Sequence, residues 1–330
     1  MKPWKWIFLV FLIVASVMIL TENRPKYRQT HNTIFSTVYN ITYNSNKDLT
    51  HGIHNVMLGV DSTLSMFNTS SLLWNINNGL DNRTNQMFLT IFNMGKAVWE
   101  STGGAFDPTV APLVNAWGFG YKHGTLPTDS QIDSILQFTG FDKIGLDSCN
   151  NVVKSDSRVM LDFSAIAKGY AVDAVAEYLK ENGVTDYMVE IGGEIAVHGA
   201  NGNGNKWRIG VSVPQPDTDG LQEILSVTDI AMATSGNYRN YFEKDGVMYG
   251  HTINPKTGYP AMNTLLSATV LAPTCAMADA TATSFMVMGC DKALEYCTAH
   301  PEIQALLIYS KQGNTMDTLC TAGFKTLALE

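Results

Sequence analysis

A carboxylate and a hydroxyl lie four residues apart in an otherwise uncharged stretch of the C-terminal half. Asp279 is the only charged residue between positions 272 and 283, and Thr283 follows it at i+4. On a helix these two side chains share one face. A buried carboxylate needs a partner, and oxygen atoms are the ligands that hard cations prefer. The pair therefore indicates half of a cation site, with helix capping by Asp279 as the alternative.

A second stretch has the form of an anion site. Residues 161–170 pass from a predicted strand through a loop of small residues into a predicted helix that runs to Asn182. The free N–H groups and the positive dipole end of such a helix attract phosphate. The loop matches neither the P-loop nor the G-x-G-x-x-G pattern. Asp162, at the end of the strand, either accepts a hydrogen bond from a ligand or caps the loop, and both interpretations stay open.

Two further loops carry residues with chemical potential. Residues 250–260 hold His251 in a turn-rich segment, where a lone histidine is more often structural than catalytic. Residues 101–109 contain Gly103-Gly104 followed by Asp107-Pro108. Paired glycines suit either a close approach of the backbone to a ligand or the end of a helix.

These loops need helices and strands to bring them together. We predict strands over 34–43, 187–197 and 265–271, helices over 47–67 and 86–102, and a closing hairpin from 305–310 and 315–321. Helices are interspersed among adjacent strands without a regular βαβ alternation. The expected fold class is therefore α+β, with mixed or antiparallel sheets flanked by helices.

Charge and cysteine content exclude several functions. The 330 residues include 22 Lys and Arg against 30 Asp and Glu, which gives a net charge of −8. No basic cluster lies outside the N-terminus, so a nucleic-acid partner is not expected. An anionic ligand must therefore be attracted by a metal and by backbone N–H groups. The five cysteines show neither a CxxC pair nor a zinc spacing.

The N-terminus has the pattern of a targeting segment. Lys2 and Lys5 precede or flank the start of an apolar run from Ile7 to Leu20, with no clear cleavage site and no cysteine to be lipidated. This pattern predicts membrane contact and a location outside the cytoplasm, on the periplasmic side of the inner membrane. The expected organisation is a signal-anchor or signal peptide over 1–20, a linker over 21–32 and one domain over 33–330.

Five segments in series resemble the signatures of one family. They are residues 105–120, 161–173, 234–241, 251–260 and 278–283. Together they are similar to the FAD:protein FMN transferases, the ApbE flavin transferases, and the likeness extends from about Thr33 to the C-terminus. One departure is Phe35-Ser36-Thr37, which stands where many members have Met-Gly-Thr. Another is that exporting members are often lipoproteins, whereas the N-terminal segment of this chain has no cysteine to be lipidated.

The resemblance implies an enzyme that cleaves the pyrophosphate of FAD and moves FMN onto a Thr or Ser hydroxyl of a target protein, with AMP leaving. It implies Mg²⁺, held by the backbone carbonyl of Ala165 and by the side chains of Asp279 and Thr283. It implies flavin and adenine contacts at Phe35, Phe67, Ala105, Phe106, Asp107, Asp162, Lys168 and Ile253.

The resemblance also suggests a base and a class of partner. His251 occupies the position of the family's histidine, and histidine is the side chain whose ordinary pKa suits a general base near neutrality. The expected acceptors are exported or membrane redox subunits, such as those of sodium-pumping NADH:quinone and Rnf-type oxidoreductases.

The same residues would serve two other functions. In an FAD pyrophosphatase, water replaces the target hydroxyl, and FMN and AMP are released. A non-catalytic flavin-binding protein would leave FAD intact, and the presence of Asp279, Thr283 and His251 argues against it. The sequence does not separate the transferase from the pyrophosphatase.

Overall fold

The computed structural model describes residues 26–329 apart from 121–125, 216–219, 238–240, 245–246 and 312–314, together with residues 4, 6 and 9–13. The strands are β1 Tyr27–Ile34, β2 Thr37–Asn44, β3 Ile144–Leu146, β4 Val152–Lys154, β5 Tyr187–Ile191, β6 Glu194–His198, β7 Trp207–Ser212, β8 Leu221–Val227, β9 Ile230–Gly236, β10 Tyr241–Lys244, β11 Val247–Gly250, β12 Leu265–Ala272, β13 Gln304–Lys311 and β14 Thr315–Cys320. The helices are α2 Thr50–Leu64, α3 Leu72–Asn77, α4 Gln86–Ser101, α5 Ala111–Ala116, α6 Asp129–Leu136, the 3-10 turn η1 Phe141–Lys143, α7 Ser164–Glu181, α8 Cys275–Met288, α9 Cys290–Ala299 and α10 Ala322–Lys325.

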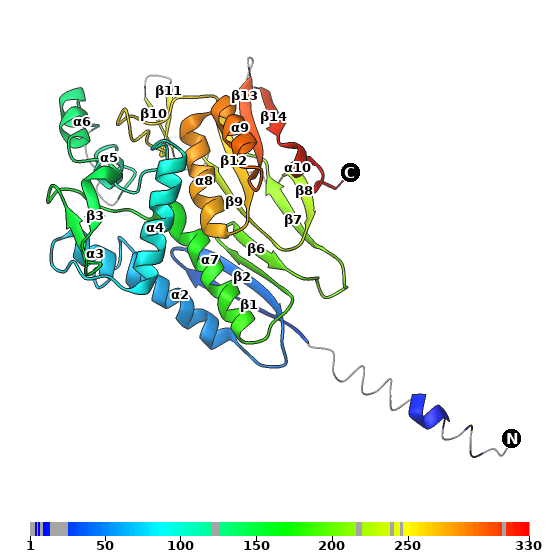
Figure 1. The fold of residues 1–330 in the computed structure, drawn as a ribbon. Coiled ribbons are helices and arrows are strands. Elements are labelled where there is room, and N and C mark those ends of the chain that lie inside the picture. Colours follow the sequence, from blue (N-terminus) through cyan, green and yellow to red (C-terminus); the bar gives the residue numbers. More distant parts are fainter. Residues whose placement is uncertain are drawn as a thin grey trace.

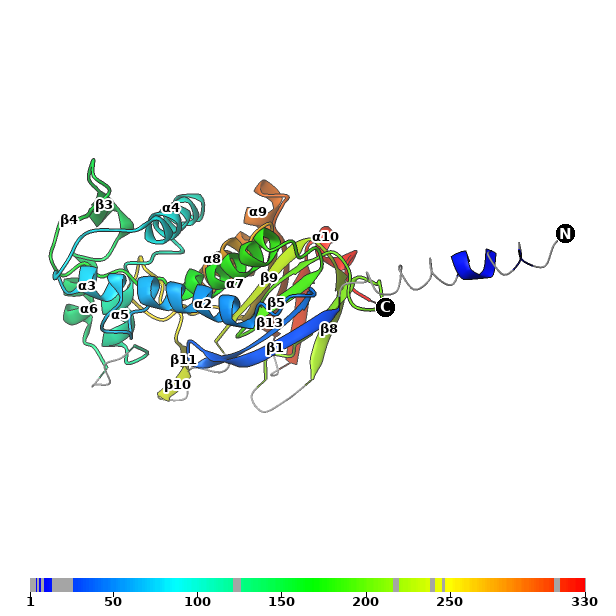
Figure 2. The same cartoon turned by 90° about the horizontal axis from the view of Figure 1, so that it is seen from below.

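One large sheet organises the fold. Its eight strands follow the order β1-β2-β5-β6-β9-β12-β13-β14, and each neighbouring pair is antiparallel. Helices α2, α7 and α8 lie on one side of this sheet (Figure 1, Figure 2). The hairpin β7–β8 packs against the other side. The predicted α+β class, with antiparallel sheets flanked by helices, is therefore confirmed.

Strand β12 connects the sheet to the helix that carries Asp279. It carries apolar side chains on both faces: Val270 packs toward α8 and α9, and Leu271 packs toward β7–β8. The strand ends at Ala272, and α8 begins three residues later. Thr274 caps α8, since its hydroxyl accepts from the amide of Met277 at 3.3 Å. A buried central strand thus fixes where α8 starts.

The predicted linker, residues 21–32, is wrong from Tyr27 onward. All eight residues of β1 pair with β2, from Tyr27 opposite Asn44 to Ile34 opposite Thr37. The segment is polar because β1 is an edge strand with exposed side chains, and edge strands tolerate polar residues. The domain therefore begins about six residues before the predicted start at position 33. Residues 21–25 lie outside the described part of the chain.

The predicted strand over 34–43 is strand β2 preceded by a turn, whereas the predicted strand over 187–197 is a hairpin. Residues 34–43 turn at Phe35 and Ser36, whose φ angles of 52° and 58° form a tight turn between β1 and β2. Such turns usually carry Asn or Gly, so the sequence did not signal this one. Residues 187–197 turn at Gly192-Gly193, both with positive φ, between β5 and β6.

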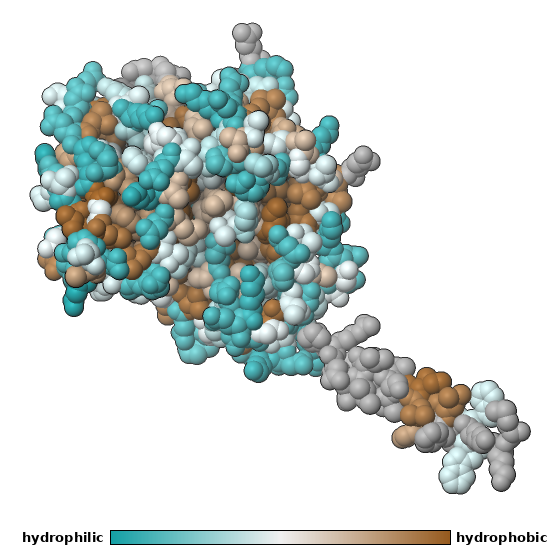
Figure 3. Space-filling model, in the orientation of Figure 1, coloured by the Kyte–Doolittle hydropathy of each residue, from teal (hydrophilic) through white to brown (hydrophobic). Residues whose placement is uncertain are grey.

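The predicted signal-anchor, residues 1–20, falls mostly outside the described residues. No helix within the described residues is long and apolar enough to cross a membrane. The large apolar side chains of residues 9–13 are between 46% and 67% exposed (Figure 3).

Candidate active site

A cavity of about 460 Å³ lies where α7 begins, where α8 passes, and where two loops meet. Predicted site residues line it from each of these elements: Phe67, Ala105, Phe106, Asp107, Asp162, Ala165, Lys168, His251, Ile253, Asp279 and Thr283. Segments that are far apart in the sequence thus meet at one place. Their individual roles toward a ligand remain predictions.

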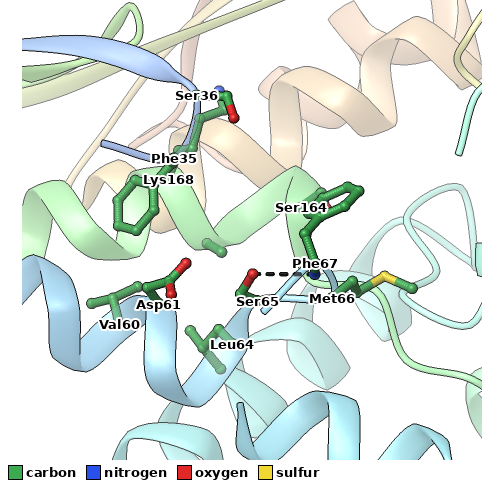
Figure 4. A pocket seen from close by; sticks show the side chains of 11 residues that line it. Phe35, Ser36, Val60, Asp61, Leu64, Ser65, Met66, Phe67, Ser164 and Lys168 are labelled. Carbon is green, nitrogen blue, oxygen red and sulfur yellow. Dashed lines mark hydrogen bonds between the residues drawn. The ribbon is translucent and has the colours of Figure 1, made fainter. Parts of the chain in front are cut away.

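Phe35 lies in an adjoining cavity of about 390 Å³. The two cavities share Phe67, Ser164 and Lys168 in their walls. Figure 4 shows the rings of Phe35 and Phe67 on different sides of this second space, with Asp61 of α2 beneath. Phe67 is 71% exposed, and an exposed aromatic ring is suited to stacking on a planar ligand. The two cavities therefore lie side by side, with Phe67 and Lys168 between them.

Asp279 and Thr283 both face the first cavity, as their i, i+4 spacing predicted. Asp279 is 4% exposed, and its Oδ2 accepts a hydrogen bond from the amide of Gly169 on α7 at 3.0 Å. The hydroxyl of Thr283 lies 3.1 Å from that of Ser235 on β9. A buried carboxylate anchored by a neighbouring helix is a fixed oxygen donor.

Helices α7 and α8 cross at close range beside Asp279 and Thr283. A Cβ atom on Gly169 would lie 2.3 Å from the carbonyl oxygen of Cys275, so only glycine fits there. One turn further along α7, Asp173 accepts hydrogen bonds from the amides of Cys275 at 2.8 Å and Ala276 at 2.9 Å. Asp173 therefore caps α8. The alternative in which Asp279 is the cap is wrong, because Asp279 lies more than a turn inside the helix.

Lys168, Glu194 and Asp279 form a charged cluster in the cavity wall. The ammonium of Lys168 pairs with Oε1 of Glu194. Burial raises the pKa of Glu194, and nearby Asp279 adds to that rise while Lys168 opposes it. Burial also raises the pKa of Asp279 against the effect of Lys168. Burial alone would lower the pKa of Lys168, but the two carboxylates outweigh it and raise the pKa.

The donor set at this cluster fits a hard cation. The side chains of Asp279 and Thr283 and the carbonyl of Ala165 offer only oxygen, and two carboxylates face one ammonium. The described residues contain no group of three or more His, Cys, Asp or Glu that could hold a metal ion. Mg²⁺ does not require one, because it commonly binds one or two carboxylates and fills its octahedron with waters and substrate phosphates.

Asp107 shapes its loop from within. Its Oδ1 accepts from the amide and hydroxyl of Thr109 at 2.8 and 2.6 Å, and its Oδ2 accepts from the amide of Phe141 at 3.1 Å and the indole of Trp99 at 3.2 Å. Burial raises the pKa of Asp107, and these donors oppose the rise. A carboxylate offers about four acceptor positions. The chain itself fills them, so Asp107 positions the cavity wall.

Asp162 caps the loop that precedes α7. Its Oδ1 accepts from the amide of Ser164 at 2.8 Å, and its own amide donates to the carbonyl of Pro108 at 2.6 Å. Burial raises the pKa of Asp162, with the bonds from Ser164 opposing. The capping interpretation is therefore confirmed, and a contact with a ligand remains a prediction.

His251 follows β11 at the start of a tightly held loop. The ring of Phe119 lies 6.4 Å from its ring, edge to face. The hydroxyl of Thr252 donates to the side-chain oxygen of Asn237 at 2.8 Å. Further along the loop, the indole of Trp117 donates to the carbonyl of Gly258 at 2.7 Å. These contacts hold the histidine at the cavity.

Comparison with known proteins decides the family, because residues 35–307 match the model of the ApbE family. The chain belongs to the ApbE family. The FAD:protein FMN transferase of Vibrio cholerae serotype O1 is 37% identical, over 89% of this chain and 92% of that protein. The solved flavin transferase ApbE of Vibrio cholerae superposes with a TM-score of 0.83 at 35% identity, over 92% of this chain and 100% of that one. The Pseudomonas stutzeri flavinyl transferase ApbE superposes with a TM-score of 0.82 at 30% identity, over 92% and 97% of the two chains. The predicted family and the predicted enzyme class, that of the flavin transferases, are confirmed.

Sequence reasoning missed several residues of this ApbE-family cavity. Ser164, Ser235 and Glu194 also line it. Glu194 left a signal, because it is an acidic residue directly after Gly192-Gly193 in a segment of buried strand residues. The serines left none, since serine is common in every kind of loop. The signature over 234–241 is described only in part, because residues 238–240 lie outside the described part of the chain.

Proposed function

We propose that this chain transfers FMN from FAD to a Thr or Ser hydroxyl of a target protein, in an Mg²⁺-dependent reaction that releases AMP. One observation carries the proposal: a single cavity is lined by Asp279, Thr283 and Lys168 from helices and by His251 from a loop. The relatives' name, FAD:protein FMN transferase, supplies the substrate class.

Phosphoryl transfer depends mainly on positioning and on charge neutralisation. Ala165, Asp279 and Thr283 would hold Mg²⁺, which when bound neutralises charge on the pyrophosphate. Lys168 binds phosphate oxygens from the same wall. The amides at the start of α7 add a second attraction, because a helix N-terminus favours anions.

The acceptor hydroxyl reacts at the phosphorus of the FMN half. His251 takes its proton, and the hydroxyl oxygen forms the new P–O bond. The bond between that phosphorus and the bridging oxygen breaks, and AMP leaves with the bridging oxygen. The product is a phosphoester between FMN and the protein.

Incubation with FAD, Mg²⁺ and a candidate acceptor protein tests the proposal. We expect a fluorescent acceptor band on a denaturing gel and one AMP released per flavin attached. Release of free FMN and AMP without a labelled band would instead establish a pyrophosphatase. FAD that stays intact through a long incubation would establish a flavin-binding protein.

We also propose that the enzyme works outside the cytoplasm, held at the inner membrane by its N-terminal segment, and modifies exported or membrane redox subunits. The support is Lys2 and Lys5 beside the apolar run from Ile7 to Leu20, together with the exposed apolar side chains of residues 9–13. Full-length protein in the membrane fraction, cut by protease added from the periplasmic side, is the expected result. A cytosolic pool or a mature N-terminus near Thr21 would contradict the tether.

A further inference from the structure

Glu194 is a buried carboxylate that the proposed reaction leaves without a role. It begins β6, directly after the turn at Gly192-Gly193, and it lines the cavity while only 3% exposed. Its Oε1 holds the ammonium of Lys168. Its Oε2 has no hydrogen-bond partner within the described residues.

A buried carboxylate oxygen without a hydrogen-bond partner indicates that a ligand binds there. Leaving a buried polar group without its hydrogen bond is unfavourable, and more so for a charged group. Native proteins therefore satisfy such atoms with protein, water or an ion. Within the described residues the only other buried side-chain atom in this condition is Oγ1 of Thr281. Thr281 does not line the cavity, so Glu194 is the one that faces a binding site.

The surroundings decide which donor suits Oε2. The Lys168 ammonium on the same carboxylate would repel a cation bound directly to Glu194. Asp279, which faces the cavity beside it, would hold the cation with Thr283, and Mg²⁺ ordinarily keeps several waters. A water bound to a divalent cation is a polarised donor that needs an acceptor. Carboxylates commonly fill this role in the outer shell of metal sites.

We propose that Glu194 is a positioning residue for the Mg²⁺ site, with Oε2 accepting a hydrogen bond from a water on the ion while Oε1 holds Lys168. The inference rests on the proposed Mg²⁺ site. It makes one side chain the link between the ion and the lysine that binds phosphate. The position and charge of Lys168 are then set together with those of the ion.

The substitution Glu194→Gln distinguishes the roles of the two carboxylate oxygens. Its carbonyl oxygen still accepts from Lys168, but its amide NH₂ replaces Oε2 and cannot accept from a metal-bound water. We expect Mg²⁺ to bind about 10–100-fold more weakly, measured by isothermal titration calorimetry of the full chain without FAD. Glu190→Gln is the matched control, because Glu190 lies on the same hairpin outside the cavity and pairs with Asn40 and the amide of Gly193.

The outcomes are distinguishable. Wild-type protein that binds no Mg²⁺ would overturn the metal site of the proposed function, and this inference with it. Equal Mg²⁺ affinity in wild type and Glu194→Gln would overturn the inference alone. Unchanged Mg²⁺ affinity with weaker FAD binding would also overturn it, since Oε2 would then contact the dinucleotide. If Glu194→Gln does not fold, Glu194→Asp keeps both oxygens but withdraws them by one methylene, and the same loss of Mg²⁺ affinity is expected.

Discussion

The helical wall and the loop wall of the cavity hold their polar groups in different ways. On the helical wall, Gly169 lets α7 and α8 pack closely, and backbone amides of each helix donate to a carboxylate of the other: Gly169 to Asp279, and Cys275 and Ala276 to Asp173. The loop wall around His251 depends on separate contacts, such as the indole of Trp117 on the carbonyl of Gly258. The first arrangement fixes distances between several oxygen donors at once. The second fixes one side chain at a time.

This difference matches what each wall would do. A cation needs several ligands within tenths of an ångström, which two packed helices supply. A general base needs only to reach one proton, so a single well-held loop suffices. Changes to the helical wall should therefore alter metal binding, and changes to the loop wall should alter turnover.

The largest effect is expected at Asp279. Asp279→Ala removes the carboxylate that α8 contributes to the cavity and should lower transfer by about 10³-fold, because charge stabilisation at the pyrophosphate is lost. The fold should persist, since removing the buried charge also removes its desolvation cost. Transfer rates at limiting Mg²⁺ measure the effect, with Thr281→Ala on the same helix as the control. A wild-type rate in Asp279→Ala would refute the assignment.

His251→Asn tests the loop wall. We expect kcat to fall about 100-fold with FAD affinity nearly unchanged, because a general base acts in the transition state and contributes little to ground-state binding. His198→Asn is the control, since His198 is half-exposed, pairs with Asp229 and lies outside the cavity. Steady-state kinetics over a range of pH measure both variants. An unchanged rate and pH profile would make His251 structural.

Gly169→Ala tests whether close packing holds the helical wall. The new Cβ would meet backbone atoms of Cys275 and Ala276 within 2.8 Å, so α8 must move. We expect a loss of about 1–3 kcal/mol in the free energy of unfolding, together with weaker Mg²⁺ activation. Gly59→Ala on α2 is the control, because its nearest neighbour is Met87 Cε at 3.8 Å. Equal free energies of unfolding in the two variants, measured in urea, would show that the crossing of α7 and α8 accommodates a methyl group at position 169.

Asp173→Ala should have the smallest effect. Loss of a helix cap typically costs about 1 kcal/mol. Burial raises the pKa of Asp173 to about 6, with the amides of Ala276 and Cys275 opposing. Because its pKa is raised in the folded state, Asp173 contributes fully to the free energy of unfolding below its unfolded pKa. This contribution declines as the pH rises through about 6. The stability gap between wild type and variant, from urea unfolding, should therefore narrow between pH 4.5 and 7.5; a widening gap would contradict this.

Features that depend on the local spacing of residues could be predicted from the sequence. Asp279 and Thr283 share a face because a helix brings i and i+4 together, whatever the rest of the chain does. Strand β12 was predictable because it is a short, mainly apolar run, as expected of a buried central strand. The family signatures then identified the loops that meet at the cavity.

Contacts between distant elements were not predictable in this way. The cap that Asp173 gives to α8 and the pairing of Lys168 with Glu194 join separate elements, so no spacing in the sequence reveals them. The hydrogen bonds that Asp107 accepts from Thr109 and from the distant Phe141 were likewise not predictable, and its contact with a ligand remains a prediction. The turn at Phe35 and Ser36 lacks the usual Gly or Asn, and its φ angles are set by the pairing of β1 with β2.

The most direct test of the division between the two walls is Mg²⁺ binding by Asp279→Ala and His251→Asn, measured side by side. A ligand that binds only the folded state raises the unfolding temperature, so thermal unfolding over a series of Mg²⁺ concentrations reports the affinity. We predict that wild type and His251→Asn are stabilised alike and that Asp279→Ala is not. Equal responses of the two variants to Mg²⁺ would contradict the account.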